Sequence, residues 1–142
     1  IEIKVGPSTI KNSLKSIEKG KILGIFPEGG ITSTELTKAK PGAVFIASKA
    51  NTQILPVSIS GGDNAWDDFL KGVRSRITIN IGKPFGPLEI KGAKEEKISK
   101  LENYNEELMC RIAALLPDDR HGDYSNDKRI ADYRRENNLD LF

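Results

Sequence analysis

The stretch Ile22-Leu23-Gly24-Ile25-Phe26-Pro27-Glu28-Gly29-Gly30 decides the fold class of this 142-residue chain. It begins with a short, almost continuous apolar run, residues 22–26, as expected of a strand that is covered on both faces. A predicted helix over residues 9–19 precedes this run, and alternating apolar and polar residues at 1–5 predict a strand before that helix. Strand, helix and strand in this order form a βαβ unit, whose strands pair in parallel. The sequence therefore predicts an α/β fold with a mostly parallel sheet flanked by helices.

Further elements follow along the chain. We expect a helix over 41–51, a strand over 53–59, a second strand over 76–81 and a long helix over 94–116. Pro56 lies inside the first of these strands, which favours a bulge or an edge position there. We divide the chain into an α/β body, residues 1–116, and a polar C-terminal tail, residues 117–142, which forms either a short docking helix or a disordered segment.

Composition narrows the class of protein. Lys and Arg number 22 against 20 Asp and Glu, a net charge of +2, which argues against a dedicated nucleic-acid binder. The single cysteine, Cys110, excludes a disulfide framework within the chain, and the single histidine, His121, excludes a His-rich metal site. We therefore expect no metal and no nucleic acid.

The polar loop that starts at Pro27 is the candidate for chemistry. It leaves the apolar run at the edge where open α/β sheets bind ligands. The glycine pair Gly29-Gly30 lets the backbone approach a substrate closely and present N–H groups to an anion. Glu28 would be a fixed carboxylate that accepts hydrogen bonds from hydroxyls or holds a cation. An ordinary turn with Glu28 in solvent stays open as the alternative.

The order of these segments resembles a known family. FPEGGIT at 26–32, then Lys40 and Gly42 at the start of a helix, then Ile54-Leu55-Pro56-Val57, is similar to two characteristic blocks of the glycerophospholipid acyltransferase family and the helix between them. That family includes the 1-acyl-glycerol-3-phosphate acyltransferases. The similarity extends over about residues 1–116, which would make them the C-terminal part of an acyltransferase α/β domain.

The resemblance implies an enzyme of phospholipid biosynthesis. It would transfer a fatty acyl group from acyl-CoA or acyl-carrier protein to a lysophospholipid hydroxyl, with no further cofactor, at the cytoplasmic face of a membrane whose surface is a partner. It implies that Pro56 shapes the pocket wall. It assigns substrate binding to Phe26, Pro27, Glu28, Gly29, Gly30, Thr32 and Lys40.

Three departures from the family pattern matter. The family's catalytic block, a His and an Asp five positions apart, has no counterpart here, so we expect it upstream of Ile1 and expect the 142 residues alone to be inactive. Ile31 stands where the FPEG block has an Arg, and Val5 where an earlier block has one. These two substitutions leave two alternatives open, an acyltransferase for a non-phosphate acceptor and a non-catalytic lipid- or membrane-binding module of the same fold.

Other chemically capable residues have simpler interpretations. Cys110 lies inside the long predicted helix and is expected to be a buried thiol. His121 lies in a polar turn after Pro117. Trp66 and Phe69 follow a Gly-Gly pair, and we expect them to pack in the core; lining an acyl tunnel or lying at a membrane interface are the alternatives.

Overall fold

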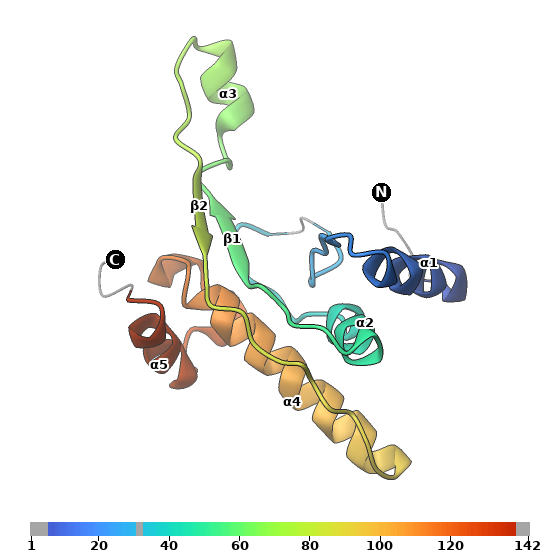
Figure 1. Cartoon of the computed structure of the whole chain (residues 1–142). Coiled ribbons are helices and arrows are strands. Elements are labelled where there is room, and N and C mark those ends of the chain that lie inside the picture. The colour runs from blue at the N-terminus through green and yellow to red at the C-terminus, as the bar shows by residue number, and fades with distance from the viewer. Residues whose placement is uncertain (1–5, 31–32, 139–142) are drawn as a thin grey trace.

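The computed structural model describes residues 6–30 and 33–138. The elements, drawn in Figure 1, are α1 (Pro7–Glu18), α2 (Gly42–Ala50), β1 (Val57–Ser60), α3 (Ala65–Leu70), β2 (Thr78–Ile81), α4 (Lys94–Ala113), the 3₁₀ turns η1 (Asp118–Arg120) and η2 (Gly122–Tyr124), and α5 (Arg129–Glu136). The long helix α4 is central: α2 lies along one side of it, α5 lies along the other, and α1 packs beside α2. The β1–β2 hairpin rises from the C-terminal end of α4 and carries α3 at its far end.

Helix α4 supplies most of the core. Glu96 in its first turn accepts the N–H of Ala93 at 3.2 Å, which satisfies an amide that the helix itself leaves unpaired. The C-terminal half of the helix is buried on two sides. One buried cluster joins α4 to α5 and the tail: Leu36, Met109, Cys110, Ala113, Ala114, Leu116, Tyr124 and Ile130. The other joins α4 to α2: Val44, Phe85, Leu88 and Leu108.

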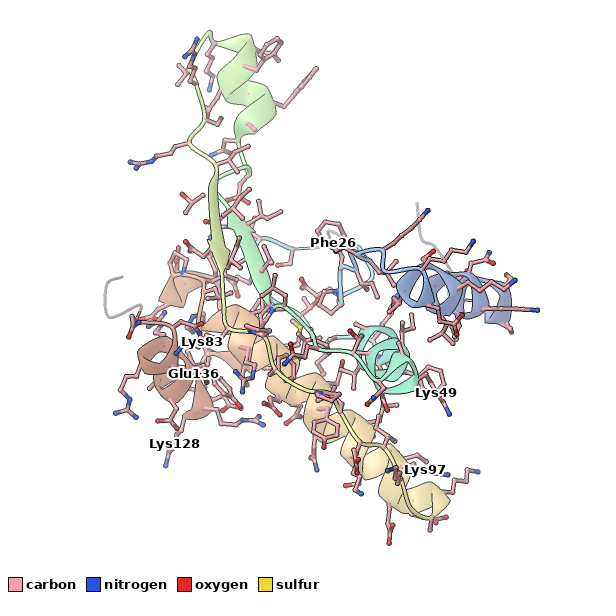
Figure 2. The ribbon with its side chains drawn as sticks, viewed as in Figure 1. Phe26, Lys49, Lys83, Lys97, Lys128 and Glu136 are labelled. Atoms are coloured by element: carbon pink, nitrogen blue, oxygen red, sulfur yellow. The ribbon has the colours of Figure 1, made fainter. Side chains whose placement is uncertain are left out.

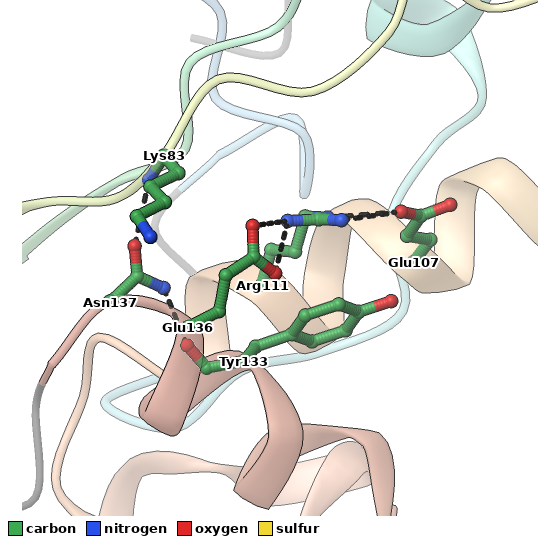
Figure 3. Close-up of polar contacts among 6 residues, drawn as sticks. All are labelled: Lys83, Glu107, Arg111, Tyr133, Glu136 and Asn137. Atoms are coloured by element: carbon green, nitrogen blue, oxygen red, sulfur yellow. Dashed lines mark hydrogen bonds and ion pairs between the residues drawn. The ribbon is translucent and has the colours of Figure 1, made fainter.

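Arg111 of α4 fixes helix α5 to the body (Figure 3). Its guanidinium forms ion pairs with Glu107 at 3.0 Å and with Glu136 of α5 at 3.2 Å. The same group lies 4.6 Å from the ring centre of Phe85 and 4.3 Å from that of Tyr133. Because an arginine between two rings and two carboxylates is held from four directions, the tail segment that carries α5 has a defined position.

The polar face of the β1–β2 hairpin packs against the end of α4. β1 and β2 are antiparallel, with Val57 opposite Ile81 and Ser60 opposite Thr78. Ser58 Oγ and Asn80 Nδ2 both donate to the carbonyl of Leu115, at 2.9 and 2.8 Å, so the sheet caps the end of α4. The opposite face is apolar, and its side chains are between 39% and 65% exposed: Val57, Ile59, Ile79 and Ile81.

The mostly parallel sheet is not confirmed among the described residues, where the only ladder is antiparallel. Residues 21–26 have no strand assignment, and Ile22 is 99% exposed. A strand exists only as a partner of another strand, and the one expected beside it, residues 1–5, lies outside the described residues. The helices expected over 9–19 and 41–51 are confirmed by α1 and α2.

Pro56 precedes β1. It is buried, and its carbonyl accepts the N–H of Gly82 at 2.9 Å at the end of the ladder. A proline has no N–H to donate, which suits this terminal position.

Candidate functional site

The FPEG segment forms a tight turn. The carbonyl of Phe26 accepts the N–H of Gly29 at 3.0 Å, and Gly29 has a φ of +82°. A positive φ of this size favours glycine, which explains the residue at this point. The carbonyl of Pro27 accepts the N–H of Lys40 at 2.8 Å, so the two ends of the loop 27–40 lie side by side.

Glu28 faces the returning end of the loop. Its Oε2 accepts the backbone N–H of Thr37 at 2.8 Å and the hydroxyl of the same threonine at 3.0 Å. The side chain is half-buried. The sequence predicted that this carboxylate accepts a hydroxyl, and the hydroxyl in the structure belongs to the chain itself. Glu28 is therefore fixed in position and does not lie in solvent.

Lys40 lies over the turn. A Cβ built on Gly29 would come within 2.9 Å of its Nζ and 3.0 Å of its Cδ. The lysine stem thus occupies the space that a side chain at Gly29 would need. This contact brings a cation next to the glycine pair, of which the Gly29 N–H already donates to the carbonyl of Phe26.

Residues of the C-terminal tail form hydrogen bonds with the loop 27–40. Leu36 donates its N–H to the carbonyl of Arg120 at 3.0 Å and accepts the N–H of Asp123 at 3.1 Å. The Asp123 carboxylate also accepts the N–H of Lys38 at 3.1 Å. On the other side, Asn105 of α4 donates to the carbonyl of Ala39 at 2.8 Å. Sequence reasoning missed all of these supports, because they join positions 66 or more residues apart.

The remaining candidate residues have different positions. Phe26 is 71% exposed (Figure 2). Gly30 follows the turn with open space at its Cα. Thr32, and Ile31 before it, lie outside the described residues. Pro56 contacts the end of β2 through Gly82, and its assignment to the pocket wall stays a prediction.

His121 and Cys110 are built into the core. His121 is 3% exposed, and its Nε2 lies 3.2 Å from the carbonyl of Leu116 and 3.3 Å from Arg134 Nη2. Burial of Cys110 raises the pKa of its thiol to about 12, so it is not the thiolate that a nucleophile requires. Among the described residues no group of three or more His, Cys, Asp or Glu is placed to hold a metal ion. Within the same ranges, none of the helices has the length and apolar character that crossing a bilayer requires.

Comparison with known proteins identifies the class. Residues 2–60, which include the FPEG turn, Lys40 and Pro56, match the family model named Acyltransferase. Together with the relatives described next, this match supports the glycerophospholipid acyltransferase family as the one that the chain resembles.

Two relatives carry the same name. The 1-acyl-sn-glycerol-3-phosphate acyltransferase of Bacillus subtilis (strain 168) is 37% identical over 79 residues, which are 56% of this chain and 38% of the relative. The enzyme of that name from Streptococcus pneumoniae (strain ATCC BAA-255 / R6) is 30% identical over 125 residues, 86% of this chain and 42% of the relative. The chain thus spans about two fifths of the length of these curated relatives. No solved structure gives a significant match.

Proposed function

We propose that this chain supplies the acceptor-binding part of an O-acyltransferase. The whole enzyme would transfer a fatty acyl group from acyl-CoA or acyl-carrier protein to the hydroxyl of a lysophospholipid, at the cytoplasmic face of a membrane. One observation carries the proposal: Glu28, Thr37 and Lys40 hold the FPEG turn in a defined shape in a chain whose relatives are named 1-acyl-sn-glycerol-3-phosphate acyltransferases.

The chemistry divides between this chain and residues outside it. The acceptor hydroxyl attacks the thioester carbonyl, a base takes the hydroxyl proton, and the thiolate of the donor leaves. General-base help of this kind contributes about 10²–10⁴-fold. We place the base, a His oriented by an Asp, upstream of Ile1. The reaction as proposed uses no metal and no cofactor beyond the acyl donor.

Lys40 is the residue of this chain that we assign to the acceptor phosphate. The family's arginine is replaced by Ile31, so the FPEG block itself offers no guanidinium. Lys40 lies against Gly29, at the turn where we place the acceptor. A lysine binds phosphate as a point charge, without the two-pronged geometry of arginine.

The exposed apolar surface supports the idea that further acyltransferase residues complete this fold. The outer face of the hairpin and the segment at 21–26 expose isoleucine, valine and phenylalanine side chains that a soluble domain normally covers. We propose that the length of the relatives not spanned here packs on this face, and that residues 22–26 then join a mostly parallel sheet.

A substitution in the full-length gene product tests the assignment of Lys40. We expect Lys40→Met to raise the KM for lysophosphatidate about tenfold or more, because one charged contact contributes about 1.5–3 kcal/mol. The KM for a monoacylglycerol, which has no phosphate, should change little. Lys38→Met is the matched control, since Lys38 is an exposed lysine of the same loop. Equal effects on both acceptors would contradict the role of Lys40.

The same assay separates the alternatives. The substitution at Ile31 favours a non-phosphate acceptor, and a parent enzyme that prefers monoacylglycerol would establish that alternative. A full-length protein that binds lipid and acylates neither acceptor would be a binding module. The isolated 142 residues serve as the negative control, and turnover by them would show that the base is placed wrongly.

A further inference from the structure

The β1–β2 hairpin ends in a structured tip that stands clear of the other helices (Figures 1 and 2). Residues 61–77 connect the two strands and contain helix α3. Ser75 Oγ donates to the Asp68 carboxylate at 2.6 Å, and the N–H of Val73 donates to the carbonyl of Asp68 at 2.8 Å. These contacts close the segment on itself, so the tip has a shape of its own.

One side of the tip is apolar. Trp66, Phe69, Leu70 and Val73 are 72%, 69%, 68% and 55% exposed. Trp66, Phe69 and Leu70 have the spacing of one face of helix α3, and Val73 follows just beyond the end of this helix. The rings of Trp66 and Phe69 stack with centres 5.9 Å apart. The expectation that these aromatic residues pack in the core is therefore wrong, since the hairpin arm, residues 57–81, holds them away from both buried clusters (Figure 1).

The charges of the tip are unevenly balanced. Of its acidic residues, Asp63 is paired with Arg120 of the body and Asp68 accepts from Ser75. The basic residues of the tip make no ion pair within the described ranges, and they outnumber the two acids without an ion pair there, Asp67 and Asp68. They are Lys71, Arg74 and Arg76. Positive charge beside exposed aromatic side chains is complementary to an anionic lipid surface.

We propose that this tip is an interfacial anchor that docks the protein on an anionic phospholipid surface. Trp66 enters the region of the lipid headgroups, where amphipathic aromatic rings are favoured, and the apolar Phe69 enters at the boundary with the acyl chains. Lys71 and Arg74 lie at the level of the phosphates. Helix α3 has six residues and lies in the surface without spanning it. The inference rests on the proposed function in one respect, that the acceptor is a lipid held in such a surface.

The emission of Trp66, the single tryptophan of these 142 residues, reports on the tip directly. The full-length gene product is titrated with phosphatidylglycerol vesicles, and the spectrum of Trp66→Phe is subtracted. We expect the difference emission to shift to shorter wavelength and to be quenched by phosphatidylglycerol brominated on its acyl chains. Phosphatidylcholine vesicles and high salt should reduce the effect, because the attraction of the basic residues is screened.

Paired variants measure the contribution of the tip. Phe69→Ser combined with Leu70→Ser should lower the vesicle partition coefficient about tenfold or more, since two large apolar side chains lose their burial. Ile98→Ser is the control, because Ile98 is an exposed apolar residue of α4. The double variant should keep its rate on a short-chain acceptor below its micelle concentration and lose rate only on vesicle-bound acceptor.

Several outcomes would overturn the proposal. The first is absence of vesicle binding, and the second is binding that leaves the Trp66 emission unchanged. The third is a Trp66 emission that is already shifted to shorter wavelength without lipid. That result would mean that another part of the protein or a second copy covers the tip. If Trp66 enters the vesicles but no acceptor is acylated, the proposed function fails and the anchor stands.

Discussion

The hydrogen bonds between Glu28 and Thr37 hold the two ends of the loop 27–40 together, and Glu28→Ala removes both of them. The acceptor in each bond is the Glu28 carboxylate, at 2.8 Å from the backbone nitrogen and 3.0 Å from the hydroxyl oxygen of Thr37. Hydrogen bonds to charged groups contribute about 1.5–3 kcal/mol each when buried. Because the carboxylate is only half-buried, we take about 1 kcal/mol for each bond, or about 2 kcal/mol for closing the loop.

This free energy has two readouts. In the full-length protein, opening the loop should lower kcat/KM for acyl transfer about 30-fold, since 1.4 kcal/mol corresponds to a factor of about ten. Hydrogen exchange of the Thr37 amide should accelerate by a similar factor, because its N–H loses its acceptor. Far-UV circular dichroism should not change, since Glu28 lies outside the helices and strands.

Glu35→Ala is the matched control. Glu35 is an exposed acid of the same loop, and its carboxylate has no hydrogen-bond partner among the described residues. It should change neither the rate nor the exchange of Thr37. If Glu28→Ala accelerated hydrogen exchange of the Thr37 amide but left kcat/KM at the parent value, the loop 27–40 would not be part of the functional site. An unchanged exchange rate would refute the contact itself.

Two further predictions concern single residues. Gly29→Ala should lower the free energy of unfolding by about 1–2 kcal/mol, because alanine is strained at the positive φ of this position and its methyl group displaces Lys40. Gly30→Ala is the control and should change little, since no atom lies within 4 Å of a Cβ built there. Equal urea midpoints for the two variants would contradict the reasoning. Cys110 should resist iodoacetamide between pH 7 and 9, because a pKa of about 12 leaves the thiol protonated there; rapid alkylation of the folded protein, followed by mass spectrometry, would show that the thiol is accessible.

The sequence predicted local elements well where a periodic pattern is independent of distant partners. Helices α1, α2 and α4 lie where their apolar spacing and their Pro and Gly boundaries placed them. Residues 22–26 did not become a strand, because a strand needs a neighbour and this segment has none among the described residues. Trp66 and Phe69 were expected in the core, but the sequence does not say what covers an apolar side chain, and here both are exposed.

The candidate site shows the same division. The sequence predicted close backbone approach at the glycine pair, and the structure adds that Gly29 forms a tight turn with a φ of +82°. The fixed orientation of Glu28 depends on Thr37, nine residues away in a polar loop without periodicity. The support from Asp123 joins Lys38 to a residue 85 positions further along the chain. No spacing rule connects such positions, so these contacts emerge only from the folded chain.

Arg120 links the loop and the hairpin arm through one side chain. One of its terminal nitrogens donates to the carbonyl of Thr34 at 3.1 Å, and the other contacts Asp63, where the arm begins. A guanidinium makes both contacts in one plane, whereas an ammonium offers a single point of charge. A movement of the hairpin arm by a few ångströms would therefore either move Thr34 with it or break one of the two contacts of Arg120. The position of the hairpin arm and the shape of the loop 27–40 are thus coupled through the Arg120 side chain.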